Sequence, residues 1–344
     1  MAFVDRLEPA ARELLLAVAR PVSFRAGDVL VRNGAAARGA FVLEHGTACA
    51  SVLLPGGERL RLAQFGPGDL FGEAALLERA TASATVSATS DVRGWLVERE
   101  SFRALVASRG PAALALQHAV TDLLCAKLRE LNARVLGCSA PEDRPARPAH
   151  AADPLAAVAR RRTVGFDHRR FLPLLALFAE FDPEEIDEVV AGAPLLELAR
   201  GAPLFHAGQP ARGCHLVVRG AVEIWGAAGN RERRLAVNGP GNLVGFMSLI
   251  AGRPHGAAAL AREATVLLEL ERERFDALYR GASLASVKLH RAILRALVAG
   301  MKRSNTQFAR LIAAARLRGA AAEGDALEAA YSSQIVAAAP SPAP

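Results

Sequence analysis

Two stretches of the chain alternate apolar and polar residues in short runs that glycines interrupt every few positions. One contains "AFVLEHGTACASVLL" (Ala40–Leu54), and the other contains "HLVVRGAVEIW" (His215–Trp225). Alternation with a period of two predicts strands with one buried face, and the glycines predict tight turns between them. Each stretch is therefore predicted to form a roll or barrel of short β-strands.

Apolar residues at helical spacing flank both stretches. Shorter helical patterns precede them over 6–19 and 171–192, and the second includes a helix-start signal at Asp182-Pro183. Long helices are predicted after them, over 111–136 and 283–318. The expected fold class is α+β, mainly β, with two tandem jelly-roll-like β-rolls that are each flanked by helices.

The two rolls are copies of each other. Matched residues lie 174 positions apart up to a hairpin tip and 173 positions apart beyond it, where the loss of one residue costs the fold little. The matched pairs include Gly27 and Gly201, Gly34 and Gly208, Arg38 and Arg212, Gly46 and Gly220, Gly68 and Gly241, Gly72 and Gly245, and Leu76 and Leu249. Their constant spacing indicates a duplicated domain.

A chain of 344 residues suits two domains of about 150 residues each. We expect a first domain over 1–137 and a second over 166–318 that includes its long C-terminal helix. Residues 138–165 are rich in Pro, Ala and Arg and predict a semi-extended linker, in which "RRRTVG" resembles a basophilic kinase site around Thr163 or is a plain linker run. Residues 319–344 are of low complexity and predict a disordered tail.

Composition narrows the classes of partner. The net charge is +7, but the arginines are mostly interleaved with Glu and Asp, which predicts solvated faces rather than a nucleic-acid surface. The four cysteines have no paired spacing, and no histidine cluster completes a metal set, so we expect reduced thiols, no metal and a cytoplasmic location. Without a signal-like segment or a run of about 18 uncharged apolar residues, a soluble protein with no membrane partner is expected.

A specific motif lies between Gly68 and Ala88. It reads Phe71-Gly-Glu-Ala-Ala-Leu-Leu77, directly after the glycine-framed first part of the roll. A helical piece, a roll, a cassette of this form and a long helix together resemble the cyclic nucleotide-binding domain family, which includes the catabolite activator protein and the regulatory subunits of protein kinase A. The resemblance covers roughly residues 10–136 and 170–300.

In that family, backbone amides at the start of a short helix face the cyclic phosphate, a glutamate accepts a hydrogen bond from the ribose hydroxyl, and an arginine pairs with the phosphate. The resemblance implies that Glu73 is the carboxylate and that Ala82 replaces the arginine. Ser83 then stands where guanine-selective members often carry a hydroxyl. The residues implied at this ligand site are Phe71, Gly72, Glu73, Ala74, Ala75, Ala82, Ser83 and Thr85.

The second cassette departs further from the family pattern. Phe246 stands in place of the glutamate and cannot accept a hydrogen bond, and His255 stands in place of the arginine. A histidine with an ordinary pKa near 6.5 is mostly neutral at cellular pH. Gly245, Phe246, His255 and Gly256 therefore predict a degenerate second pocket. Because a charge-assisted hydrogen bond contributes about 1.5–3 kcal/mol, the loss of the arginine predicts binding about 10- to 150-fold weaker in the first.

Three functions follow from these observations. The leading one is a non-catalytic sensor in which cAMP, cGMP or another small anionic ligand enters the first roll and shifts the following helix. The long helices over 111–136 and 283–318 would then signal to a protein partner, pair within the chain or self-associate.

The alternatives are a ligand-independent scaffold with vestigial pockets and a DNA-binding transcription regulator. Missing arginines favour the scaffold, whereas the retained Glu73 opposes it. The residues after Arg318 are too few and too alanine-rich for a helix-turn-helix. No nucleophile–base motif, P-loop or metal spacing predicts an enzyme.

Overall fold

A computed structural model describes residues 3–54, 57–77, 81–147, 153–156, 158, 160 and 167–317. Its contacts divide the chain into two units. Unit 1 comprises Met1–Ala140 and Val298–Pro344, and unit 2 comprises Pro141–Leu297. This division differs from the expected one, because the boundary falls inside the last helix and its final part belongs to unit 1.

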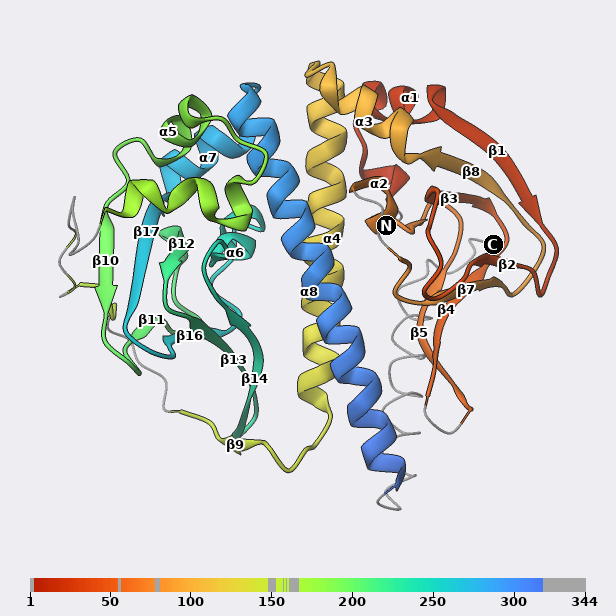
Figure 1. Cartoon of the computed structure of the whole chain (residues 1–344). Helices are drawn as coiled ribbons and strands as arrows, with labels where there is room; N and C mark the ends of the chain where they lie inside the picture. The colour runs from red at the N-terminus through yellow and green to blue at the C-terminus, as the bar shows by residue number, and fades with distance from the viewer. Residues whose placement is uncertain are drawn as a thin grey trace. The chain divides into compact units, whose positions relative to one another are not determined.

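Unit 1 is a β-roll of two four-stranded antiparallel sheets, with strand orders β1-β8-β3-β6 and β2-β7-β4-β5 (Figure 1). Its strands are β1 (Ala19–Phe24), β2 (Val29–Val31), β3 (Gly39–His45), β4 (Ala48–Leu53), β5 (Arg59–Phe65), β6 (Leu70–Phe71), β7 (Thr85–Ala88) and β8 (Val92–Glu98). In β5, Leu60 and Leu62 are buried while Arg59 and Arg61 are exposed. This alternation buries the apolar face of the strand in the roll and leaves the charged face in water.

Helices complete unit 1. They are η1 (Val4–Arg6), α1 (Pro9–Ala17), the four-residue α2 (Ala74–Leu77), α3 (Arg99–Ala107) and α4 (Pro111–Gly137). Apolar residues of α4 at helical spacing, Leu116, Val120 and Leu124, are almost fully buried. The predicted long helix over 111–136 is thus present.

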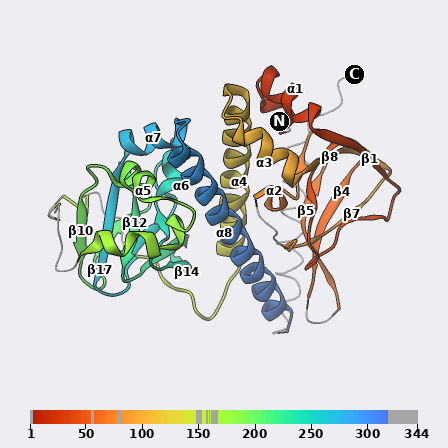
Figure 2. The same cartoon turned by 45° about the horizontal axis from the view of Figure 1, so that its top comes forward.

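The last helix, α8 (Leu284–Leu317), packs its final part on α4 within unit 1 (Figures 1 and 2). Ser304 Oγ lies 2.7 Å from Asn132 Oδ1 of α4. At Gly300 the approach is so close that an added Cβ would lie 2.8 Å from Leu128 Cδ2. The apolar stripe of this helix therefore meets α4 of the same chain, which is one of the two pairings that the sequence left open.

Unit 2 repeats the roll, with sheets ordered β10-β17-β12-β15 and β11-β16-β13-β14-β9 (Figure 1). Its strands are β9 (Arg144–Pro145), β10 (Leu195–Leu198), β11 (Pro203–Phe205), β12 (Gly213–Arg219), β13 (Val222–Ala228), β14 (Arg231–Asn238), β15 (Leu243–Val244), β16 (Ala258–Ala261) and β17 (Thr265–Glu271). Both rolls together confirm the predicted fold class.

The helical parts of unit 2 are η2 (His168–Arg170), η3 (Leu172–Leu174), η4 (Ala176–Phe178), α5 (Pro183–Val190), α6 (Phe246–Ile250), α7 (Arg272–Arg280) and α8 up to Leu297. The Asp182 side chain accepts from the Glu185 amide while Glu185 reaches back to the Asp182 amide, a capping box that starts α5. The pattern over 171–192 thus forms 3₁₀ turns and one short helix rather than a continuous helix.

The linker predicted over 138–165 needs correction in its described part. Arg144 and Pro145 form β9, which pairs with β14 in antiparallel register. Asp143 accepts hydrogen bonds from Arg233 Nε at 2.6 Å and from Arg231 Nη1 at 2.8 Å. This part of the segment packs on unit 2 because its charged side chains pair with opposite charges on β14. The composition of the segment does not reveal these pairs. Thr163 and residues 319–344 lie outside the described residues.

Two features of the described part of the chain concern membranes and metals. Among its helices, none combines the length and the apolar character that a membrane crossing needs. Among the same residues, His, Cys, Asp and Glu form no cluster that could hold a metal ion.

Candidate functional site

The first cassette begins at a glycine with a left-handed backbone. Gly72 has a φ of 76°, which turns the chain from β6 into α2. The amide of Ala75 donates to the Gly72 carbonyl at 2.9 Å, and the amide of Leu76 donates to the Glu73 carbonyl at 3.1 Å. The Ala75 amide, which the family resemblance assigns to a phosphate, is therefore engaged inside the turn.

A cavity of about 380 Å³ opens beside this cassette within unit 1. Its lining includes seven of the eight implied site residues, Phe71, Gly72, Glu73, Ala74, Ala75, Ala82 and Ser83. Thr85 is not part of this lining, and its Oγ1 accepts a hydrogen bond from the Asn33 amide at 3.1 Å. Side chains from α4 and from the unit 1 part of α8 complete the cavity wall.

The carboxylate of Glu73 is buried and paired. Its side chain lies 3.1 Å from Lys127 Nζ on α4, and Glu73 is 5% exposed. Lys127 also donates to the Leu70 carbonyl at 2.9 Å and lies 5.5 Å from the centre of the Phe65 ring. A buried carboxylate needs such a countercharge, because desolvation otherwise outweighs its remaining interactions.

The resemblance places the family's cation at Ala82, so the sequence did not predict a role for Lys127. This lysine lies 54 residues beyond Glu73. One signal was available: lysine occurs three times in the chain, and two of the three, Lys127 and Lys302, line this cavity. Among the described residues, Lys127 and Arg134 of α4, Lys302 of α8 and Arg6 of η1 bring positive charge to this cavity.

Two further cations illustrate this arrangement. Arg134 of α4 is buried, donates to the Leu62 carbonyl and stacks over the Phe308 ring at 4.5 Å. Lys302 lies on α8, and its ammonium makes no hydrogen bond or ion pair with the residues that the structure describes. Of the two lysines that line this cavity, Lys127 forms an ion pair with Glu73 and Lys302 does not.

The second cassette keeps the backbone of the first. Gly245 has a φ of 92° and leads into α6. The amide of His255 donates to the Gln209 carbonyl at 2.9 Å, and its carbonyl accepts from the Gly208 amide at 2.7 Å. The matched backbone bonds of Ala82 measure 3.0 and 2.9 Å. The two copies therefore hold the family's arginine position in the same way.

The side chains at the second cassette differ from those of the first. The His255 ring stacks on Phe205 with the ring centres 3.7 Å apart, and burial together with His215 lowers the pKa of His255 to about 4. His255 is therefore neutral at cellular pH. An added Cβ on Gly245 would lie 3.4 Å from both rings, whereas one on Gly256 would meet nothing within 4 Å. With Phe246 buried at the place of Glu73 and His255 neutral, the second cassette has neither a carboxylate nor a charged side chain at these two positions.

The second sequence copy also lacks the helix member of the charged pair. At the offset of 173 residues between the copies, the position that corresponds to Lys127 is Gly300. The same offset matches buried residues of α4 to buried residues of α8, namely Leu116 with Leu289, Val120 with Ile293 and Leu124 with Leu297. Both members of the Glu73–Lys127 pair are thus replaced, by Phe246 and Gly300.

A family model described as "Cyclic nucleotide-binding domain" matches the chain twice, over residues 21–109 and 195–281. The two matches together cover slightly more than half of the chain. The chain belongs to the cyclic nucleotide-binding domain family. It carries this domain in tandem, as the duplicated glycine pattern predicts.

Two curated relatives are similar to part of the chain. The Cyclic AMP receptor protein of Thermus thermophilus is 36% identical over 122 residues, which cover 35% of this chain and 56% of that protein. The Acetyltransferase Pat of Mycolicibacterium smegmatis is 35% identical over 100 residues, which cover 29% of this chain and 30% of that protein. The chain thus matches about half of the first relative's length and less than a third of the second's.

Solved structures also resemble the chain. The regulatory domain of Toxoplasma gondii PKA with cAMP is 19% identical, covers 80% of this chain and 87% of its own, and has a TM-score of 0.30. The N-terminal domain of a transcriptional regulator from Streptomyces coelicolor is 32% identical, with coverages of 39% and 94% and a TM-score of 0.32. A cyclic nucleotide-binding domain from Methylobacillus flagellatus is 21% identical, with coverages of 45% and 93% and a TM-score of 0.39.

Proposed function

We propose that this protein is a non-catalytic regulatory module in which unit 1 binds a small anionic ligand at its cassette and unit 2 does not. The first candidate ligands are the cyclic nucleotides cAMP and cGMP. The observation that carries the proposal is the Glu73–Lys127 pair, which is buried in the wall of a cavity of about 380 Å³. Cavities of about 300–1,000 Å³ are typical of small-molecule sites.

The pair argues for binding because it is expensive for a scaffold to keep. A buried ion pair contributes little net stability relative to well-packed apolar residues, and Phe246 with Gly300 shows that the same fold forms without it. A phosphate entering the cavity could share Lys127, while Glu73 accepts a hydrogen bond from a ligand hydroxyl. Lys302 would supply a further charge-assisted hydrogen bond.

Regulation would follow from where these cations lie. Lys127 belongs to α4 and Lys302 to α8, so an anion that attracts both ammonium groups favours one position of these helices over another. Such differential affinity is what a ligand needs in order to shift a conformational equilibrium. The output would be a changed contact of these helices with a protein partner or with a second copy.

A ligand-independent scaffold is the alternative function. It is favoured by Ala82, which leaves the family's arginine position in the first cassette without a cation, and by the stacked His255 and Phe205 in the second. In that case the cavity of unit 1 would be a remnant of an ancestral site.

Calorimetric titration of the full chain with cAMP, cGMP and a cyclic dinucleotide tests the proposal. We expect one site per chain for one of these ligands, and about 10- to 150-fold weaker binding in Lys302→Met, since one charge-assisted hydrogen bond contributes about 1.5–3 kcal/mol. Arg310→Met is the matched control, because Arg310 is exposed on the same helix and does not line the cavity.

Two outcomes contradict the sensor. Equal weakening by Lys302→Met and Arg310→Met would show a general charge effect instead of a site. No heat with the wild-type chain, combined with binding created by Ala82→Arg, would assign the scaffold with a vestigial pocket.

A further inference from the structure

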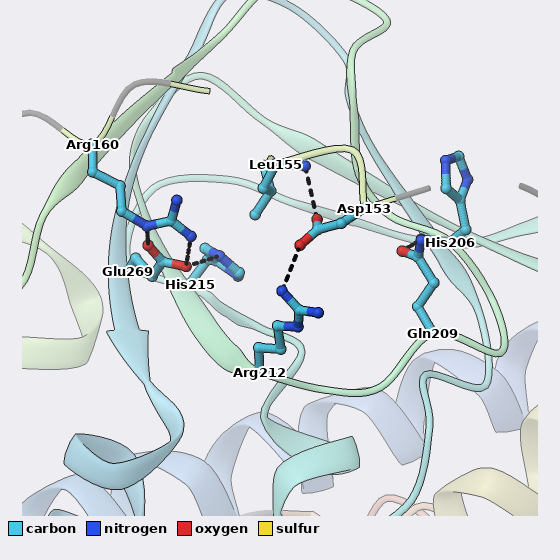
Figure 3. A network of polar contacts seen from close by, with 8 residues as sticks. All are labelled: Asp153, Leu155, Arg160, His206, Gln209, Arg212, His215 and Glu269. Atoms are coloured by element: carbon cyan, nitrogen blue, oxygen red, sulfur yellow. Dashed lines mark hydrogen bonds and ion pairs between the residues drawn. The ribbon is translucent and has the colours of Figure 1, made fainter. Parts of the chain in front are cut away.

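The described residues between Asp153 and Arg160 contact the roll of unit 2, to which they belong (Figure 3). Arg160 donates to Glu269 of β17 through Nε at 2.7 Å and Nη2 at 3.2 Å. Seven residues earlier, Asp153 Oδ2 accepts from Arg212 at 3.1 Å, while Asp153 Oδ1 caps the Leu155 amide at 2.9 Å. Opposite charges thus hold both ends of the segment.

Two apolar residues of this segment, Leu155 and Val158, pack against the core of unit 2. Leu155 is 7% exposed and belongs to the core cluster that includes Phe205, Val217 and Leu267, and Val158 packs against the same cluster. Burial acts to raise the pKa of Glu269, but His215 and Arg160 outweigh it and hold this pKa below its usual value. The recess of unit 2 therefore has an apolar floor and one charged anchor at each end.

Unit 1 has a cavity of about 370 Å³ at the matched place. Its lining includes Val22, Phe24, Leu30, Val31, Arg32, Ala35, Arg38, Phe41 and Leu96. At the offsets of 174 and 173 residues, these correspond to Leu196, Leu198, Leu204, Phe205, His206, Gln209, Arg212, His215 and Glu269. Several of these counterparts surround the bound segment in unit 2 (Figure 3). This cavity, here called the unit 1 recess, thus corresponds in position to the surface of unit 2 that contacts Asp153, Leu155 and Arg160.

The chemistry of the unit 1 recess specifies what it would bind. Arg38 keeps the charge of Arg212, so the occupant needs an acidic residue at its start. Phe41 and Leu96, which face each other across β3 and β8, replace the pair of His215 and Glu269. The occupant therefore needs no arginine at its far end and can bury an apolar or aromatic side chain there.

The chain carries such a sequence once more after its second long helix. The bound segment reads "DPLAAVAR" (Asp153–Arg160), and the C-terminal part of the chain reads "DALEAAY" (Asp325–Tyr331), with Asp and Leu again two positions apart. When Asp325 is matched to Asp153, Ser332 stands at the position of Arg160, where the described lining of the unit 1 recess has no carboxylate for an arginine to pair with.

We propose that the unit 1 recess is the docking site of the chain's own segment Asp325–Tyr331, in which Asp325 pairs with Arg38 and Leu327 enters the apolar floor. This inference does not depend on a ligand at the cassette. Because the Arg38 side chain is exposed, its ion pair would set the register of the segment, while burial of Leu327 would supply most of the affinity.

The C-terminal segment is long enough to reach this recess. Arg316, near the end of α8, pairs with Glu58, whose carbonyl accepts from the Leu54 amide at the end of the β4–β5 hairpin. From Leu54 the strand β4 runs back to Ala50. Ala50 pairs with Val86 of β7, which in turn pairs with Val31 of β2 at the recess. This path is about 13 Å along the strand and about 10 Å across the sheet, whereas the residues from 318 to 325 span up to about 27 Å.

Hydrogen exchange of the full chain tests the docking. We expect Leu327→Asp to raise amide exchange in residues 29–41 by about 10-fold or more, while the matched control Ala337→Asp leaves it unchanged. Exchange in unit 2 should not change in either variant. Both substitutions lie beyond the described fold, and equal thermal unfolding of the two variants would confirm that the fold is intact.

Reversing the two charges tests whether Arg38 and Asp325 contact each other. Arg38→Asp should raise exchange in the same residues, and Arg38→Asp combined with Asp325→Arg should restore protection. A peptide of residues 325–331 added to Leu327→Asp should also restore it. Equal exchange in Leu327→Asp and Ala337→Asp would overturn the docking, and protection that appears only at high protein concentration would overturn docking within one chain in favour of a second copy.

Discussion

At the first cassette a buried carboxylate is held by a lysine from the following helix, whereas the second cassette places two stacked rings and a phenylalanine on the same backbone. The left-handed glycine and the paired backbone bonds are alike in both. The second copy has Phe246 and Gly300 at the places of Glu73 and Lys127, so neither charge is left there buried and unpaired. The comparison teaches that the backbone of a binding cassette persists where its chemistry has been exchanged.

The largest effect should come from breaking the pair in unit 1. Lys127→Met leaves Glu73 buried without its countercharge, and we expect a loss of about 3 kcal/mol of unfolding free energy in urea denaturation. The double variant Glu73→Leu with Lys127→Met should recover most of this loss, because it imitates the apolar solution of unit 2. A double variant as unstable as the single one would show that the pair is not coupled.

A smaller effect concerns the histidine of unit 2. Its pKa is about 4 in the folded chain against an ordinary 6.5, so the unfolded chain binds the extra proton between these values. The stability that His255 contributes is therefore complete above pH 6.5 and declines as the pH falls toward 4, on the order of 1 kcal/mol per pH unit. His255→Ala, which copies Ala82, should flatten this slope in thermal unfolding between pH 7 and 5. An unchanged slope would assign it to other groups.

The smallest effect should come from Thr85, whose counterpart in unit 2 is Ala258. Thr85→Ala removes the hydrogen bond with the Asn33 amide and should cost about 1 kcal/mol of unfolding free energy. Ligand affinity should not change, because Thr85 does not line the cassette cavity. If Thr85→Ala lowers the binding free energy measured by calorimetry by more than it lowers the unfolding free energy, Thr85 contacts the ligand.

Much of the fold was predictable because its determinants are local. Glycines such as Gly72 and Gly245 meet a backbone requirement that repeats at a fixed offset, so the duplication and the rolls can be recognised before any contact is known. Five residues that line the cassette cavity, Phe71 to Ala75, stand in one contiguous motif of the sequence. The sequence predicts a neutral His255, whereas the stacking of its ring on Phe205 could not be predicted.

The missed features depend on contacts between distant residues. Lys127 resembles any helix lysine until α4 brings it to Glu73. Leu155 and Arg160 stand in a Pro- and Ala-rich stretch that suggests a linker, and the core that accepts Leu155 is built from strands far away in the sequence. Unit 2 therefore begins earlier in the chain than composition indicates.

Gly300 limits which side chains the second copy can carry at the position of Lys127. The second copy has no side chain there, and Leu128 of α4 lies so close that an added Cβ would be 2.8 Å from its Cδ2. A lysine at Gly300 would therefore require the Leu128 side chain to move. Because Phe246 also stands at the place of Glu73, one substitution would not give the second copy the buried ion pair of the first.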